Sequence, residues 1–174
     1  QVTINSLSRR TIVCNSKNLP HMQKLPVYKN GWQIVDSCYS HLPHSTALAI
    51  VVFENEWMEE FGRSQKVLDV LTEILVEWSS ERRYVSGYFI NGIPYKDLRV
   101  SGLALGPKYV WVYTETDVKL CKTSLVHELV HVAIRAENGK HGDADHEGPR
   151  YKGWTRKHTK FIKKTNKILC EIGL

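Results

Sequence analysis

The sequence predicts an α+β fold, in which a buried helix packs against an antiparallel sheet. Residues 118–137 are apolar around most of a helical circumference, which is typical of a central helix. Short β-rich runs between residues 83 and 114 are separated by turn signals, as in antiparallel strands. Residues 154–172 combine helical periodicity with many lysines and predict a basic C-terminal helix.

Length and composition favour one domain spanning residues 1–174. The chain has 174 residues, of which 42% are apolar, enough for an ordinary core. Residues 1–45 contain three prolines and predict an irregular arm, with a strand only at 32–35. No apolar run approaches the roughly 20 residues that cross a bilayer. Because the first residue is Gln1 and not Met, we expect a processed or trimmed chain.

Two elements are expected between the arm and the β-rich region. Residues 47–54 (ALAIVVFE) are short, apolar and β-rich, and predict a buried strand. Ser64 is a suitable N-cap for an amphipathic helix that ends near Arg83, because apolar residues recur every three or four positions.

The β-rich region predicts three or four short strands, at 83–90, 93–98, 100–105 and 108–114. Asn91-Gly92 between the first two is a strong hairpin signal. The last run (KYVWVYT) suits either an edge strand, on which an extended peptide pairs its backbone, or an inner strand. The helix that follows is expected to end at an Asn138-Gly139 C-cap.

His127, Glu128 and His131 form an H-E-x-x-H motif inside the predicted central helix. Residues four apart lie on one helical face, so the two imidazoles can converge on one ion. Zinc hydrolases use this arrangement, with the glutamate left unbound as the general base toward metal-bound water. A spurious match would leave the Glu128 carboxyl buried at a large desolvation cost. We therefore expect one catalytic Zn²⁺.

The third protein ligand is expected from the Gly- and Asp-rich loop that follows the helix. His146 is one candidate, and Asp143 or Asp145 is the other. Zinc accepts imidazole and carboxylate ligands alike, so the chemistry leaves both open. An aspartate that does not bind the metal can orient an imidazole instead.

Residues 121–170 resemble the SprT-like zinc peptidases, which belong to the minimal zincins. The resemblance rests on H-E-x-x-H, fourteen intervening residues, a histidine, a Gly-Pro-x-Tyr segment and a basic helix. It implies a zincin-like domain in which His127, His131 and His146 hold the metal and Glu128 is the base. The sequence departs from the family pattern by placing Glu147 before Gly148.

These motifs predict a zinc metalloprotease, a hydrolase that acts on a protein or peptide substrate. Tyr151 and His158 are the candidate hydrogen-bond donors to the oxyanion, although both also suit packing roles. One alternative, implied by the same resemblance, is a protease that acts on DNA-bound proteins. A second alternative is a non-catalytic basic binding module whose zinc is structural.

Charge is compatible with a nucleic-acid partner but does not favour one. The formal net charge is +6, from 24 basic and 18 acidic residues. The predicted C-terminal helix carries Arg156, Lys157, Lys160, Lys163, Lys164 and Lys167. A solvated helix face explains these charges without phosphate contacts, because no exposed aromatics are interleaved with them.

The four cysteines predict two disulfides. Helices of equal length joined by a loop bring Cys121 and Cys170 together if they pack antiparallel, which leaves Cys14 to pair with Cys38. Disulfides persist in oxidising compartments, so we expect a secreted or periplasmic protein. The alternative is four free thiols in an intracellular, DNA-associated protein.

Overall fold

The computed structural model describes residues 10–14, 27–29, 32–35, 42–86, 88–90, 93–115, 117–139, 146 and 153–174. The helices are α2 (Leu42–Phe61), α3 (Gln65–Thr72), α4 (Leu125–Asn138) and α5 (Arg156–Glu171), with a 3-10 turn η2 (Leu120–Lys122) before α4. The strands are β1 (Arg10–Cys14), β2 (Val27–Lys29), β3 (Trp32–Val35), β4 (Leu75–Ser79), β5 (Arg83–Val85), β6 (Tyr88–Ile90), β7 (Ile93–Tyr95), β8 (Leu98–Val100), β9 (Gly102–Gly106) and β10 (Tyr109–Tyr113). The predicted α+β class is confirmed.

The main sheet is mixed, so the prediction of an antiparallel sheet is wrong. Its strand order is β2-β3-β1-β4-β10-β9. The four inner strands run parallel to one another, and only β2 and β9 at the two edges pair antiparallel. Parallel neighbours need long connections, and the chain provides them. Helices α2 and α3 lie between β3 and β4, and the excursion β5 to β9 lies between β4 and β10.

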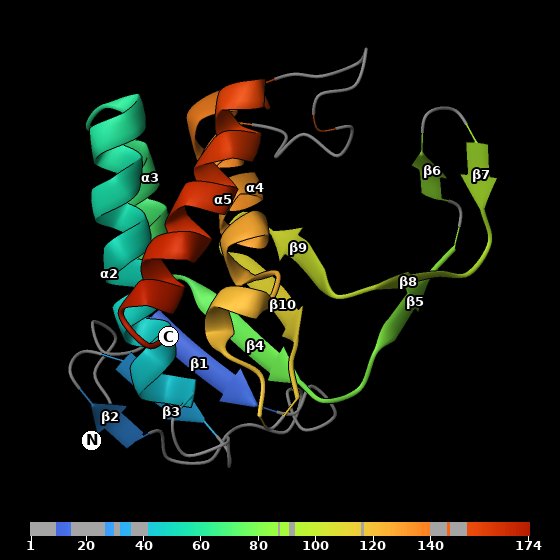
Figure 1. Cartoon of the computed structure of the whole chain (residues 1–174), viewed down its shortest axis with the longest axis horizontal. Helices are drawn as coiled ribbons and strands as arrows, with labels where there is room; N and C mark the ends of the chain where they lie inside the picture. The colour runs from blue at the N-terminus through green and yellow to red at the C-terminus, as the bar shows by residue number, and fades with distance from the viewer. Residues whose placement is uncertain are drawn as a thin grey trace.

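The antiparallel pairing predicted for the β-rich region is confirmed, but the described residues of the region form six short strands, β5 to β10, and not the three or four predicted. Strand β5 pairs with β8, β6 with β7, and β9 with β10. The first two pairs form a ribbon that projects away from the helices and the main sheet (Figure 1). The run KYVWVYT becomes β10, an inner strand between β4 and β9. The edge-strand interpretation of that run is therefore wrong, and the edge belongs to β9.

The N-terminal segment contains more regular structure than the predicted irregular arm. The strand expected at 32–35 is confirmed as β3. Strand β1 lies inside the sheet, between β3 and β4, and Ile12 within it is fully buried. Its five residues are too few to show a clear local pattern, and long-range pairing on both sides holds them in the sheet.

Residues 47–54 lie in helix α2, so the strand predicted there is wrong. The buried residues Ala49, Ile50, Phe53 and Trp57 recur at helical spacing and continue past the end of the predicted strand. Short apolar runs do not distinguish a buried strand from a buried helix, and packing of this face overrides the β preference of the valines.

The helix predicted from Ser64 to Arg83 ends at Thr72. The Ser64 N-cap is confirmed, since its side chain accepts a hydrogen bond from the Val67 amide. The apolar pattern continues beyond the helix because Ile74, Val76 and Trp78 also alternate with a period of two. Val76 and Trp78 belong to β4, which lies near the middle of the sheet, and Ile74 directly precedes it.

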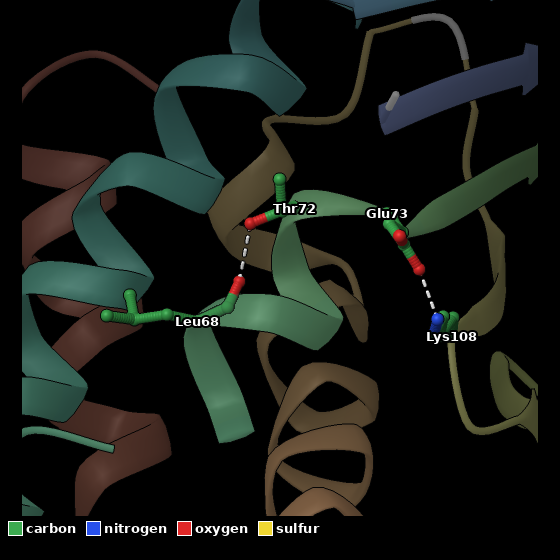
Figure 2. A network of polar contacts seen from close by, with 4 residues as sticks. All are labelled: Leu68, Thr72, Glu73 and Lys108. Carbon is green, nitrogen blue, oxygen red and sulfur yellow. Dashed lines mark hydrogen bonds and ion pairs between the residues drawn. The ribbon is translucent and has the colours of Figure 1, made fainter. Parts of the chain in front are cut away.

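The end of α3 is attached to the turn before β10. Figure 2 shows Thr72 donating to the Leu68 carbonyl, while Lys108 forms an ion pair with Glu73. The Leu75 amide also donates to the Lys108 carbonyl, at 2.8 Å. Both charged side chains are well exposed, so the ion pair contributes little stability beside the backbone bond.

The helices pack on one face of the main sheet (Figure 1). Helix α4 is the central one, because it contacts β9 and β10 as well as α3 and α5. Eight of its fourteen residues are buried. Its start is later than predicted, since Leu120–Lys122 form the turn η2 and Thr123 is extended. Its predicted C-cap is confirmed, with Gly139 in the left-handed region at φ 79°.

The C-terminal helix and its disulfide agree with the prediction. Helix α5 spans 156–171 and packs on α2 and α4. Cys121 in η2 is bonded to Cys170 in the last turn of α5, with a Cα–Cα distance of 5.4 Å. Cys14 is also disulfide-bonded, and its expected partner Cys38 lies outside the described residues. Among the residues that the structure describes, no helix is long and apolar enough to span a membrane.

Replacing both Cys121 and Cys170 by serine should lower the free energy of unfolding. The bridge closes a sequence separation of 49 residues, for which the loss of loop-closure entropy predicts about 4 kcal/mol. Urea unfolding of the wild type and the double variant measures the difference. An unchanged unfolding midpoint would show that the bridge does not constrain the unfolded chain.

Candidate metal centre

Helix α4 carries three polar groups into a largely apolar environment. His127 and His131 are partly exposed, whereas Glu128 is only 4% exposed. The helix begins after Ser124, whose hydroxyl is 2.7 Å from that of Ser101, next to β9. This contact lies at the end of α4 that carries the motif, and it ties the helix to the edge of the sheet.

The three predicted histidine ligands converge. The Nε2 atom of His146 lies 3.0 Å from that of His127 and 3.1 Å from that of His131. His146 reaches this position with a left-handed backbone, φ 52°, which is uncommon for a residue with a side chain. The loop residue and the two helix residues therefore direct their ring nitrogens to one point.

The geometry of the three imidazoles fits a metal ion. One candidate nitrogen from each of His127, His131 and His146 lies within 4.8 Å of the others. Two nitrogen ligands of a tetrahedral zinc ion, each about 2.0–2.1 Å from the metal, lie roughly 3.3 Å apart, close to the distances here. A neutral imidazole has one donor and one acceptor nitrogen, so direct contacts cannot satisfy three converging nitrogens as well as a shared cation can.

His127 is held in the neutral form that binds metals. Burial, followed by the charges that His131 and His146 would carry, lowers the pKa of His127 to about 3. Its lone pair is therefore available at neutral pH, and a metal ion need not displace a proton from this residue.

The Glu128 carboxyl lies in a tight and dry environment. Burial raises its pKa to about 8. Its Oε2 atom is buried and has no hydrogen-bond partner among the described residues. Gly102 of β9 packs directly on it, because a Cβ at that position would come within 2.8 Å of the Glu128 Cγ and of the Ser124 Cβ. Such an unpaired buried acid is costly and is typical of functional sites.

His158 has a structural position rather than an open one. Its Nδ1 accepts a hydrogen bond from the Thr155 amide at 2.9 Å and completes the capping box of α5. Its ring stacks on Phe61 with a centroid distance of 4.4 Å. His158 is 7% exposed. The packing alternative for this residue therefore has direct support, while its predicted catalytic role stays untested.

The remaining sequence candidates for the site lie outside the described residues. These are Tyr151, predicted as an oxyanion donor, and Asp143 and Asp145, predicted as alternative ligands. Sequence reasoning missed two residues that shape the site, Gly102 and Trp154. Neither belongs to a motif, and both act through contacts between elements far apart in the chain.

Comparisons of the chain with protein-family models, with curated proteins and with solved structures found no match. The resemblance to the SprT-like peptidases therefore stays a prediction from the motif alone.

In metal-free protein, Glu128→Gln should remove a pH-dependent loss of stability. The folded-state pKa of about 8 exceeds the ordinary 4.5, so the stability of the wild type falls as pH rises through this interval. The variant lacks this loss, and relative to its value at pH 4 it should gain about 4–5 kcal/mol over the wild type by pH 9. Urea unfolding of both proteins at pH 4, 7 and 9 in the presence of a chelator tests this. Parallel pH profiles would contradict the desolvated carboxyl.

Proposed function

We propose that this protein is a zinc-dependent peptidase, with His127, His131 and His146 as metal ligands and Glu128 as general base. The observation that carries the proposal is the convergence of three Nε2 atoms beside a buried, unpaired carboxyl. Three nitrogen ligands from the protein leave a further position for water or substrate, as catalytic zinc sites require. A zincin-like architecture is part of this proposal.

The bound metal would supply Lewis-acid polarisation of a carbonyl and a lowered pKa for water. The protein supplies the proton transfers. The Glu128 carboxylate would accept a proton from the attacking water and then donate it to the departing amine. A divalent cation beside the carboxyl favours its ionised form and offsets the burial that raises its pKa.

A peptide substrate is favoured by the position of β9. Among the residues that the structure describes, this strand forms the edge of the main sheet, a position at which an extended chain can pair with backbone groups. The same strand contacts Glu128 through Gly102. Backbone pairing on β9 would therefore hold a peptide next to the general base. Leu103 and Leu105 on this strand are partly or well exposed and provide apolar contact for side chains.

The basic face of α5 does not give the DNA-directed alternative additional support. All six basic residues of this helix are exposed. Lys164 lies 3.6 Å from Glu56 and 3.8 Å from Glu60, and Lys157 donates to the Glu60 carbonyl. Contacts with α2 therefore engage two of the six.

We propose that the protein acts in an oxidising compartment, a secreted or periplasmic location with which the Cys121–Cys170 bridge is compatible.

The purified protein should contain one equivalent of zinc per chain. His146→Ala, or His127→Ala with His131→Ala, should remove this zinc because each change takes away ligands from a three-ligand site. His44→Ala is the matched control, since His44 is an exposed histidine on α2 and should leave the metal content unchanged. Elemental analysis after preparation without chelator gives the stoichiometry. Equal zinc content in all four proteins would refute the assignment of the ligands.

Glu128→Gln should keep the zinc and lower the rate of peptide hydrolysis by about 10²–10⁴-fold, because the general base is lost while the imidazoles remain. Glu137→Gln is the control, as it replaces an exposed carboxyl on the same helix. Cleavage of an unstructured protein substrate, followed by mass spectrometry, measures both variants. Full activity in Glu128→Gln would exclude the proposed role.

A further inference from the structure

Trp154 lies against all three of the converging histidines. The centroid of its ring is 5.2 Å from that of His127, 4.8 Å from that of His131 and 4.6 Å from that of His146. The contact with His146 is edge-to-face, with an interplanar angle of 85°. Trp154 is only 1% exposed. One buried indole therefore contacts side chains from both α4 and the loop that follows it.

The polar atom of this indole is engaged elsewhere. The Trp154 Nε1–H donates to the Thr159 hydroxyl, at 3.0 Å, in the first turns of α5. Buried tryptophans need such a partner, and here the partner also fixes the rotation of the ring.

The backbone on both sides of Trp154 is also fixed. Gly153 has φ 131°, and a Cβ there would lie 2.4 Å from the Asn138 side-chain nitrogen and 2.9 Å from the Ile134 Cγ2. On the other side, Thr155 is the N-cap of α5 and forms the capping box with His158. The indole is therefore held from α4 through Gly153 and from α5 through the cap.

We propose that Trp154 is a positioning residue that holds the three imidazoles in their metal-binding arrangement, an inference that rests on the proposed zinc site. Imidazole rings in a partly exposed site have several staggered rotamers, and each ring must adopt one of them before it binds metal. A rigid, buried neighbour shared by the three rings reduces this freedom in the metal-free protein. It also excludes water from one side of the ligands, which strengthens metal binding.

The first experiment compares Trp154→Leu with Trp57→Leu. Trp57 is a fully buried tryptophan whose ring packs on Phe61 and His158, and it serves as the matched control. Competition with a chromophoric chelator measures zinc affinity. We expect a loss of about 10–100-fold in Trp154→Leu, the usual effect of removing a group that orients metal ligands. The wild-type affinity should be kept in Trp57→Leu, although both variants lose stability.

The second experiment uses Trp154→Phe, which keeps an aromatic ring in the same place. Zinc affinity in this variant should stay closer to the wild type than in Trp154→Leu. Co²⁺ binding should quench part of the intrinsic tryptophan fluorescence of the wild type, because the indole lies next to the ligands. That quenching should be absent in Trp154→Phe and present in Trp57→Phe. This comparison does not depend on the folding of either leucine variant.

Two results would overturn the inference while the proposed function stands. One is wild-type zinc affinity in a folded Trp154→Leu protein, and the other is equal Co²⁺ quenching in Trp154→Phe and the wild type. A wild-type protein that binds neither Zn²⁺ nor Co²⁺ would overturn the proposed zinc site and this inference together, so the two failures are distinguishable.

Discussion

Burial of the Glu128 carboxyl is the constraint on which the arrangement of the site depends. A carboxyl with 4% exposure and an unpaired oxygen destabilises the fold, a cost that is typical of functional sites. Helix α4 must bury enough apolar surface to offset this cost, and its contacts with the sheet and with α3 and α5 provide that burial. On the sheet, position 102 must be a glycine, since any side chain there would occupy the space of Glu128 or Ser124. Strand β9 and helix α4 can therefore pack closely because Gly102 has no Cβ.

The arrangement of the three histidines also requires that residues after α4 fold back to contact this helix. His146 comes back to within 3.0 Å of His127, and Trp154 follows eight positions later to pack on the same rings. The start of α5 then holds Trp154 through Thr159. A helix that offers two histidines therefore obtains its third nitrogen and its apolar cover from one short stretch of chain. His158 belongs to this support, because it closes the cap that fixes the position of Trp154 along the helix.

The sequence predicted the cluster of three histidines better than it predicted the sheet. The H-E-x-x-H spacing follows from helix geometry alone, so His127, Glu128 and His131 were identifiable without tertiary information. His146 needed the resemblance, because the loop offered carboxylates as well. Strand β1 and the parallel pairing of β4 with β10 depend on contacts between distant segments, and residues 74–78 fit a helical period as well as an alternating one. The contact of Trp154 with the histidines was not predictable from the sequence, since a tryptophan at the start of a helix is usually interpreted as a core residue.

The disulfide between Cys121 and Cys170 lies at one end of the pair formed by helices α4 and α5. At one end α5 is joined covalently to the turn before α4, while at the other end the described contacts are noncovalent, among them those of Gly153 with Asn138 and Ile134. Helices α4 and α5 should therefore begin to separate beside Gly153, while the Cys121–Cys170 bridge keeps their other ends together. Partial openings of this kind have lower free energies than global unfolding. Backbone amides near Asn138 and Thr155 should thus exchange with solvent sooner than those near Leu125 and Leu169, and the three converging histidines can become accessible while the core stays intact.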